Sequence, residues 1–451
     1  MSDTARAHTG RPAPEEPRLT TRQARRRPVP RRVVVALVLA LAGLLSLTVS
    51  GNTFRPFERI TTLEARMASK SDFFKDPEVQ RLLLEHGLRV DIHRLGSRGI
   101  ATQSLTDMDV VFPSGQPAAK LVLDRQEKSV RSVRPFVTPL VLGTFRAYAE
   151  TLVKTGVATP QENPDGGPTL YYDLDMAAFM TLLDGREDGK ATADQDGDGR
   201  VEGADTWNGI GYDRDDGSGD GGSGDGGSGD GGRSNGGRVL VRTSDVCESN
   251  SAGTYLSLLA FVANRNSTPG TQNTDDPRLA ADAVTALAAK IKPLINLQGM
   301  WADEQADSYF SDLGESIAPI SLLYEHQYLA HQITYHEQHD KQDTNRVLLY
   351  PTPYALTEPQ LISLTDQGDR LVQLLQDNEE LRDRAIELGF RVRVSGEDGT
   401  GERLGAYLRD HGIQEPVPNS DQTKSYEPEL DVLERIIDHV GNCPPPAQDT
   451  P

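Results

Sequence analysis

One stretch, residues 238–264, constrains the fold of this chain more than any other. It reads RVLVRTSDVCESNSAGTYLSLLAFVAN, in which the β-branched run 239–241 predicts a covered strand and the apolar run 255–262 predicts a helix. A turn rich in hydroxyl and amide side chains joins them. Such a turn leaves backbone N–H groups at the start of a helix, where they can hold a carboxylate, an oxyanion or a sugar hydroxyl. An ordinary helix N-cap uses the same residue types, so both interpretations stay open.

The amino-terminal segment predicts the compartment. Residues 33–50, VVVALVLALAGLLSLTVS, contain no charged residue, and as a helix they would span roughly 27 Å, long enough to cross a bilayer. Six arginines between positions 22 and 32 precede this segment. Because positively charged flanks stay in the cytoplasm, we expect a single-pass protein of the cell membrane whose bulk is extracellular. A cleaved signal peptide is the alternative, since small residues occur at 49–51.

The net charge of the chain limits the kinds of partner that it can bind. The formal net charge is −20; residues 1–32 carry nine arginines and three acids, a net of +6, so the remainder carries −26. An acidic exterior argues against a nucleic-acid partner, because phosphate binding depends on Lys and Arg.

The only two cysteines, Cys247 and Cys443, both fall on the side expected to be exported. An even count in an oxidising compartment suggests one disulfide, with two free thiols as the alternative.

Strands followed by serine-containing turns recur in the first part of the exported chain. Strands are expected at 60–65, 88–92 and 110–112, with a helix at 72–84. The turns after the three strands contain, in order, Ser69 with Ser71, Ser97 with Arg98, and Ser114 with Gly115. In an open α/β sheet ligands gather at the carboxyl ends of the strands, which is where these turns would lie.

With these turns in view, the chain resembles the type II periplasmic, or extracellular, solute-binding protein superfamily, and more narrowly the membrane-anchored substrate-binding-like proteins of actinobacteria. The resemblance covers roughly residues 59–393. Its marks are FFKDPEVQRLLLEHGLRVDIHRLGSRGIA (73–101), VVFPSGQPAA (110–119), RPFVTPLVLGTFRAYAETLVKTGV (134–157), SDVCESNSAGTYLSLLAFVAN (244–264) and LLYPTPYAL (348–356). It implies two α/β lobes joined by crossing segments near 135–141 and 349–353, with ligand held in the cleft between them.

The resemblance also implies which residues face the cleft. They are small polar side chains from the turns of both lobes, one arginine and two residues at the end of the second lobe: Ser69, Ser71, Ser97, Arg98, Ser114, Gly115, Thr138, Ser249, Asn250, Ser251, Tyr324 and Glu325. Hydroxyls and amides converging from two lobes select polar or anionic solutes. The chain lacks a lipid-attachment cysteine after its apolar segment, so a sensing role stands beside coupling to a transporter.

A calcium loop is expected within the second lobe. Residues 194–205, DQDGDGRVEGAD, place oxygen donors at loop positions 1, 3, 5, 9 and 12 and a glycine at position 6, the EF-hand spacing. The ligands would be Asp194, Asp196, Asp198, Glu202 and Asp205, with the backbone carbonyl of Arg200. Asp205 replaces the usual Glu, so the loop is similar to the dockerin type. The alternative is an acidic, glycine-rich linker that happens to match.

Two further segments carry no catalytic signal. GSGDG occurs three times in residues 217–231 without an apolar residue, which predicts a flexible exposed loop. His336 and His339 flank Glu337 one residue short of the H-E-x-x-H spacing of zinc hydrolases. These histidines, with His326 and His331, are expected at the surface between a helix at 320–329 and a strand at 346–350.

The sequence therefore predicts an α/β, two-lobe, periplasmic-binding-protein-like fold preceded by one transmembrane helix. The expected parts are a cytoplasmic tail (1–32), the anchor (33–50), lobe 1 (57–135 and 350–400), lobe 2 (136–349) with an insertion (185–237), and a carboxyl-terminal extension (401–451). The expected function is extracellular capture of a small polar or anionic ligand for transport or sensing, without catalysis. A calcium-stabilised surface protein with a degenerate cleft is the alternative.

Overall fold

The computed structural model describes residues 60–126, 129–164, 166–184, 206–212, 235–247, 249–269, 277–297, 302–393, 401–417 and 424–443. The apolar segment 33–50, the acidic loop 194–205 and the glycine-rich repeat 217–231 lie outside these ranges. Within the ranges, no helix has both the length and the hydropathy needed to cross a membrane. The residues from 60 onward form one compact unit, which contains two β-sheets.

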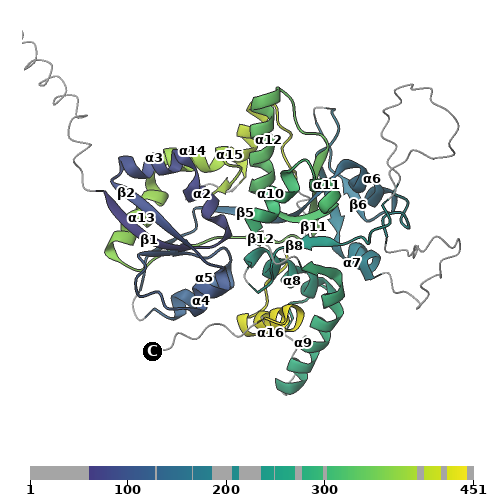
Figure 1. Cartoon of the computed structure of the whole chain (residues 1–451), viewed down its shortest axis with the longest axis horizontal. Helices are drawn as coiled ribbons and strands as arrows, with labels where there is room; N and C mark the ends of the chain where they lie inside the picture. The colour runs from purple at the N-terminus through teal and green to yellow at the C-terminus, as the bar shows by residue number, and fades with distance from the viewer. Residues whose placement is uncertain are drawn as a thin grey trace, which may run out of the picture. The chain divides into compact units, whose positions relative to one another are not determined.

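The first sheet, in lobe 1, has the strand order β2-β1-β3-β13-β4. Its strands β1 and β2 are labelled in Figure 1. β1 runs parallel to β2 and β3, and β13 runs antiparallel to β3 and β4. The strands are β1 (Thr61–Met67), β2 (Leu88–Arg94), β3 (Val110–Phe112), β4 (Ser132–Val133) and β13 (Leu361–Ser363). The helices are η2 (Ser69–Ser71), α2 (Asp72–Lys75), α3 (Pro77–Glu85), α4 (Ser97–Thr102), α5 (Gln116–Asp124), α13 (Asp366–Asp377) and α14 (Glu379–Glu387).

The second sheet, in lobe 2, has the order β6-β7-β11-β5-β10-β8-β9. Its strands are β5 (Phe136–Phe145), β6 (Ala158–Pro160), β7 (Tyr171–Asp175), β8 (Val241–Thr243), β9 (Ile295–Leu297), β10 (Ile320–Tyr324) and β11 (Arg346–Thr352). Its helices are α6 (Arg146–Lys154), α7 (Met176–Asp184), α8 (Asn250–Ala263), α9 (Pro277–Ile291), η3 (Lys292–Leu294), α10 (Ala302–Phe310), α11 (Gly314–Ile317) and α12 (Glu325–His339). The predicted mixed α/β architecture is confirmed, and the names lobe 1 and lobe 2 denote the parts built on the first and the second sheet.

The long strand β5 leads from one lobe into the other. All ten of its residues are buried, in keeping with its apolar and β-branched sequence FVTPLVLGTF. Its first residues pair with two short strands, β12 (Leu356–Thr357) and β14 (Arg391–Val392), and its later residues pair with β10 and β11 in the second sheet. The crossing near residues 135–141 therefore coincides with the start of β5, and the return crossing lies between β11 and β12.

Five phenylalanines fix the loop after β1 against the crossing strand. Ring pairs join them at centroid distances from 4.0 to 6.2 Å, mostly edge to face, and the residues are Phe73, Phe74, Phe112, Phe136 and Phe390. Such aromatic pairs contribute about 0.5–1.5 kcal/mol each beyond the burial of their area. Because the cluster joins α2, β3 and β5, it holds η2 beside the end of β3.

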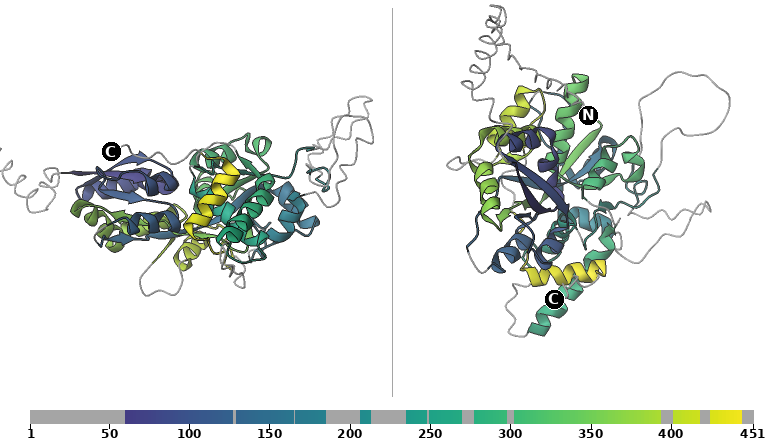
Figure 2. Two further views of the ribbon diagram at one scale, coloured as in Figure 1. Left: turned by 90° about the horizontal axis from the view of Figure 1, so that it is seen from below. Right: turned by 60° about the vertical axis from the view of Figure 1, so that its left-hand side comes forward.

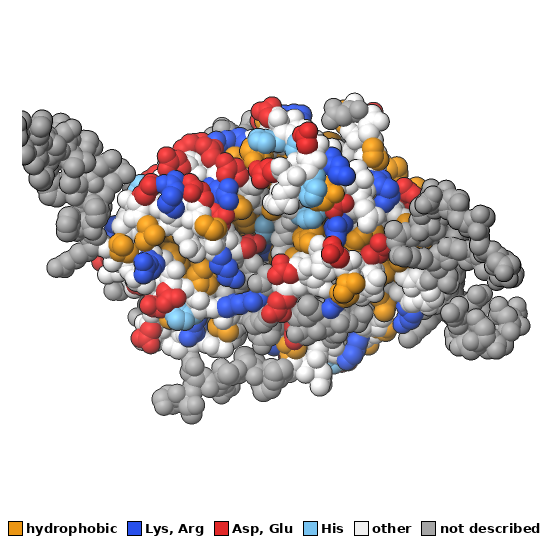
Figure 3. All heavy atoms as spheres, turned by 45° about the horizontal axis from the view of Figure 1, so that its top comes forward, with side chains coloured by type: hydrophobic (Ala, Val, Ile, Leu, Met, Phe, Trp, Pro, Cys, Tyr) orange, Lys and Arg blue, Asp and Glu red, His pale blue; other side chains and the backbone are white. Residues whose placement is uncertain are grey.

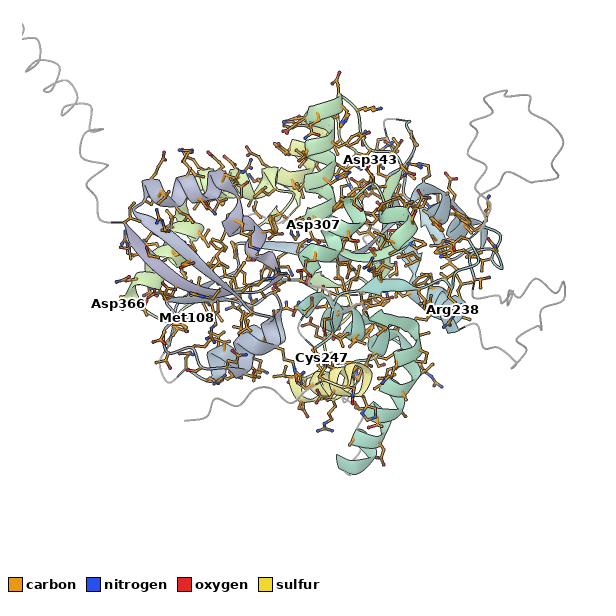
Figure 4. The ribbon with its side chains drawn as sticks, viewed as in Figure 1. Met108, Arg238, Cys247, Asp307, Asp343 and Asp366 are labelled. Carbon is orange, nitrogen blue, oxygen red and sulfur yellow. A yellow bond between two sulfur atoms is a disulfide. The ribbon has the colours of Figure 1, made fainter. Side chains whose placement is uncertain are left out.

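The last helix of the carboxyl-terminal extension packs on lobe 2. It contains α15 (Glu402–Asp410) and α16 (Leu430–Gly441), and α16 lies beside α8 and α9 (Figures 1 and 2). The apolar face of α16 is buried, with Ile436 fully inaccessible. A disulfide joins Cys247, just before α8, to Cys443, just after α16 (Figure 4). The predicted disulfide is confirmed, and it ties the end of α16 to lobe 2.

Several local predictions were wrong. The helix expected at 72–84 is interrupted at the extended residue Asp76, and the strand expected at 239–241 lies at 241–243. Residues 320–324 form the strand β10 rather than the start of a helix, because this short apolar run is buried between β5 and β8, and α12 begins only at Glu325. The helix after β8 begins at Asn250 instead of Tyr255. Asn250, Ser251 and Thr254 therefore belong to the first turns of α8, whose N-cap is Ser249.

Candidate functional site

Three serines of lobe 1 meet at the carboxyl ends of the parallel strands. Ser69 follows β1, Ser97 begins the helix after β2, and Ser114 follows β3. The hydroxyls of Ser69 and Ser114 lie 3.0 Å apart, and the backbone N–H of Ser114 donates to the Ser97 hydroxyl over 3.0 Å. All three are buried, as is Ser71 in the next turn. The serine turns of lobe 1 therefore lie together at the carboxyl ends of the strands, as expected for parallel strands of one sheet.

Lobe 2 contributes a second serine cluster at the start of α8. The hydroxyls of Ser244, Ser249 and Ser251 form a triangle with sides of 2.7 to 2.9 Å. All three residues are buried. Ser244 was missed by sequence reasoning, although it directly follows β8 and the rule applied to lobe 1 would have found it.

The two clusters meet across the lobe boundary. Gly115 of lobe 1 lies against Asn250 of lobe 2 so closely that a Cβ at Gly115 would be 2.8 Å from the Asn250 Cγ atom. The hydroxyl of Tyr324, at the end of β10, lies beside the side chains of Asn250, Ser69 and Ser251. Burial raises the pKa of Tyr324 to about 12. Residues predicted from both lobes therefore share one closed, polar centre.

Lys70 occupies this centre and was missed by sequence reasoning. It stands between the two predicted serines of the first turn, yet its side chain is fully buried. Its ammonium nitrogen lies 3.4 Å from the centroid of the Tyr324 ring and donates to the Ser114 carbonyl over 3.3 Å. No carboxylate among the described residues lies within 4.0 Å of it. Burial therefore lowers the pKa of Lys70 well below its usual range, and the more distant Asp72 and Glu427 oppose this shift.

Glu427 approaches the same centre from the carboxyl-terminal extension. Its Oε1 atom accepts a hydrogen bond from the Thr254 hydroxyl over 3.3 Å. Its Oε2 atom is inaccessible to solvent and has no hydrogen-bond partner among the described residues. Burial raises the pKa of Glu427 to about 7, despite the opposing effect of Thr254 and Lys70. No sequence signal pointed to this carboxylate, which lies 357 positions after Lys70.

Arg98, expected at the ligand, is engaged by α16. Its guanidinium forms ion pairs with Glu434 over 2.6 Å and with Asp438 over 2.7 Å, and only 12% of its side chain is exposed. The partners lie 336 and 340 positions away in the sequence. Arg98 therefore links lobe 1 to the helix that the disulfide ties to lobe 2.

Thr138 lies in the crossing strand, at the junction of the lobes. Its hydroxyl is 3.1 Å from Nδ1 of His326, whose Nε2 is 2.9 Å from Asp72 of lobe 1. His326 is buried, so the prediction that it lies at the surface was wrong. It lies two positions after the end of the buried strand β10, and that strand ends at the junction of the lobes. His331, His336 and His339 follow on α12.

Glu325, the last predicted cleft residue, is fully buried at the start of α12, directly before His326. It receives two hydrogen bonds from Arg391, over 2.6 and 2.7 Å, and a third from the Tyr350 hydroxyl over 2.7 Å. Such a satisfied carboxylate holds β14 to lobe 2.

The predicted calcium ligands, Asp194, Asp196, Asp198, Arg200, Glu202 and Asp205, lie outside the described residues.

Comparisons with known proteins concern the whole compact unit. No family model matches the sequence, and no curated protein matches it. Among solved structures, iron-bound HitA from Pseudomonas aeruginosa is similar at 10% identity and a TM-score of 0.46, over 84% of this chain and 99% of that one. The periplasmic binding protein AfuA from Actinobacillus pleuropneumoniae, bound to fructose-6-phosphate, is similar at 11% identity and a TM-score of 0.42, over 84% and 96%. The Azotobacter vinelandii periplasmic molybdate-binding protein is similar at 12% identity and a TM-score of 0.35, over 73% and 99%.

Proposed function

We propose that this chain is a membrane-anchored extracellular solute-binding protein that holds a small polar or anionic ligand between its lobes, for transport or sensing and without catalysis. One observation carries the proposal. Lys70 is a fully buried lysine with no close carboxylate in the part of the chain that the structure describes, and it lies where the serine-bearing turns of both lobes meet.

The electrostatics of this centre favour an anion. A buried ammonium without a close counter-ion is unstable in its charged form, which is why the pKa of Lys70 is lowered. An anion beside it would restore the charged form and gain a charge-assisted hydrogen bond. The hydroxyls of Ser69 and Ser114 lie within the same cluster, and the N-terminus of α8 adds backbone N–H groups on the opposite lobe. Together these groups suit a small oxyanion, such as a carboxylate or a phosphate.

Other parts of the proposal rest on the sequence alone. The anchor at 33–50 would hold the lobes at the outer surface, and a calcium ion at 194–205 would act as a structural staple at extracellular calcium levels. A transporter or a signalling protein would be the partner. On the face shown in Figure 3, acidic and basic side chains are interspersed, which together with the net charge of −20 supports a partner other than nucleic acid.

The test is a screen of small polar and anionic compounds for a rise in the melting temperature of the full-length chain. A ligand of the centre should raise it in the wild type and lose that effect in Ser249→Ala combined with Ser251→Ala. Ser257→Ala is the matched control, because Ser257 is a buried serine of the same helix that donates to the Gly253 carbonyl over 3.1 Å. An equal shift in the double variant would contradict binding at this centre.

One observation favours a second candidate function. Lys70 and Tyr324 fill the space between the serine clusters, and α16 spans from Arg98 to the disulfide. A surface structural or interaction protein, stabilised by calcium, would keep its lobes permanently closed in this way. The absence of any thermal shift across the screen would favour this second function over solute binding.

A further inference from the structure

A cavity adjoins the polar centre under the carboxyl-terminal helix, and four predicted cleft residues line part of it: Ser97, Arg98, Ser249 and Asn250. It has a volume of about 140 Å³ and is enclosed by α4 and α5 of lobe 1, α8 of lobe 2, and α16. Most of its wall is apolar, formed by Ala101, Ala118, Leu121, Leu430, Leu433 and Ile437. For comparison, an apolar cavity of about 150 Å³ is large enough to bind benzene.

One end of this cavity carries the carboxylate of Glu427. The Oε2 atom of Glu427 is buried and without a hydrogen-bond partner among the described residues. Leaving such an acceptor unpaired is costly, whereas a donor delivered by a ligand would remove the cost. The other polar groups at this end, Asn250 and Thr254, are already hydrogen-bonded to each other over 3.3 Å.

The charges around the cavity favour a cation. Arg98 lines the wall, but Glu434 and Asp438 together more than neutralise it. Glu427 adds a further negative charge when ionised. A charged Lys70, in the neighbouring polar centre, would offset the negative charge of Glu427, but burial disfavours the charged form of Lys70. A ligand bearing an ammonium group would therefore meet a net negative surrounding, and a carboxylate would be repelled.

We propose that this cavity binds a small organic cation whose apolar, ring-sized body fills the space between α5, α8 and α16 and whose ammonium group pairs with Glu427. An outer groove shares Leu121, Glu427 and Leu430 with the cavity and gives a route of entry. The cavity borders the polar centre and shares Ser249, Asn250 and Glu427 with it, but Lys70 does not line the cavity, so the proposal does not rest on capture of an anion at Lys70.

Benzylamine is the probe, because it combines one ring with one ammonium group and is protonated at neutral pH. Its binding to the full-length chain would be measured by isothermal titration calorimetry, beside benzyl alcohol and benzoate, which keep the ring and change the charge. Glu427→Gln removes the charge at the site, and Ala118→Leu fills the cavity. Glu85→Gln is the matched control, since Glu85 lies on α3, lines neither the cavity nor the groove, and has 41% of its side chain exposed.

The proposal predicts saturable binding of benzylamine that weakens about tenfold or more in Glu427→Gln and is blocked in Ala118→Leu. Glu85→Gln should bind benzylamine as the wild type does, and both the neutral and the anionic probe should bind more weakly to the wild type. Equal binding of benzoate, an unchanged affinity in Glu427→Gln, or no binding of benzylamine at millimolar concentration would each overturn the proposal. Because Glu427 and Lys70 act on each other's charge, benzylamine binding is also measured in Lys70→Met. Retained benzylamine binding in that variant would separate this proposal from the capture of an anion at Lys70.

Discussion

Replacing Arg391 with methionine should destabilise the chain far more than removing an arginine from the surface. Arg391 lies in β14 and forms two hydrogen bonds to Glu325, at the start of α12. Glu325 is fully buried, and 16% of the Arg391 side chain is exposed. The Tyr350 hydroxyl supplies the remaining hydrogen bond to Glu325. The substitution therefore leaves a buried carboxylate with one neutral donor.

The expected magnitude follows from that burial. Removing one partner of a buried ion pair costs about 3–5 kcal/mol, because the remaining charge is uncompensated. Removing both charges together, as in Arg391→Met with Glu325→Gln, should cost less than the sum of the single substitutions. Arg81 is the surface control: it pairs with Glu78, and their side chains are 51% and 43% exposed. Such an exposed pair contributes about 0–1 kcal/mol.

Urea unfolding at constant pH, followed by circular dichroism, measures these differences. The midpoint should fall steeply in Arg391→Met, slightly in Arg81→Met, and by an intermediate amount in the double variant. If Arg391→Met and Arg81→Met lose the same free energy of unfolding, the pair does not hold β14 to lobe 2 and the reasoning fails.

Three further predictions concern the extension and the acidic loop. The folded pKa of Glu427, about 7, lies above its unfolded value, so protonated Glu427 stabilises the fold below about pH 4.5, and up to about 3 kcal/mol of this stability is lost as the pH rises toward 7. Glu427→Gln should therefore flatten the plot of melting temperature against pH between pH 4.5 and 7. An unchanged slope would refute the assignment. Chelation of calcium should lower the melting temperature of the wild type but not of Asp196→Ala with Asp198→Ala; equal behaviour would mean that residues 194–205 are only a linker. Replacing Cys247 and Cys443 by serine should lower the free energy of unfolding by about 4–5 kcal/mol in the chain-entropy model, because the bridge spans 196 positions; a change below about 1 kcal/mol by urea unfolding would contradict it.

The sequence predicted correctly those parts of the fold that depend mainly on residues close together in the chain. The three segments expected as strands, at 60–65, 88–92 and 110–112, became β1, β2 and β3. Their serine turns converged because parallel strands end at one edge of a sheet. The paired cysteines formed the predicted bridge because the chain offers only one pairing. Residues 320–324 were misassigned because a short apolar run reads equally as buried strand or helix.

The features that sequence reasoning missed depend on contacts between distant residues. Lys70 looks like a solvated lysine in its turn, and only the packing of Tyr324 across the lobe boundary buries it. Arg98 looked free for a ligand because its acidic partners on α16 are more than 330 positions away. Glu427 was missed for the same reason, because it is far from the polar centre in the sequence. It reaches Thr254 on α8 only because the carboxyl-terminal extension folds back onto that helix.

The central claim, that the two lobes grip an anion at Lys70, is tested most directly by calorimetric titration of the compound that gives the largest thermal shift. Lys70→Met keeps the packing and removes the ammonium group; Lys120→Met, at a position whose side chain is 69% exposed, is the control. The account predicts an affinity at least about tenfold weaker in Lys70→Met and unchanged in Lys120→Met. Equal affinity in the wild type and Lys70→Met would contradict it.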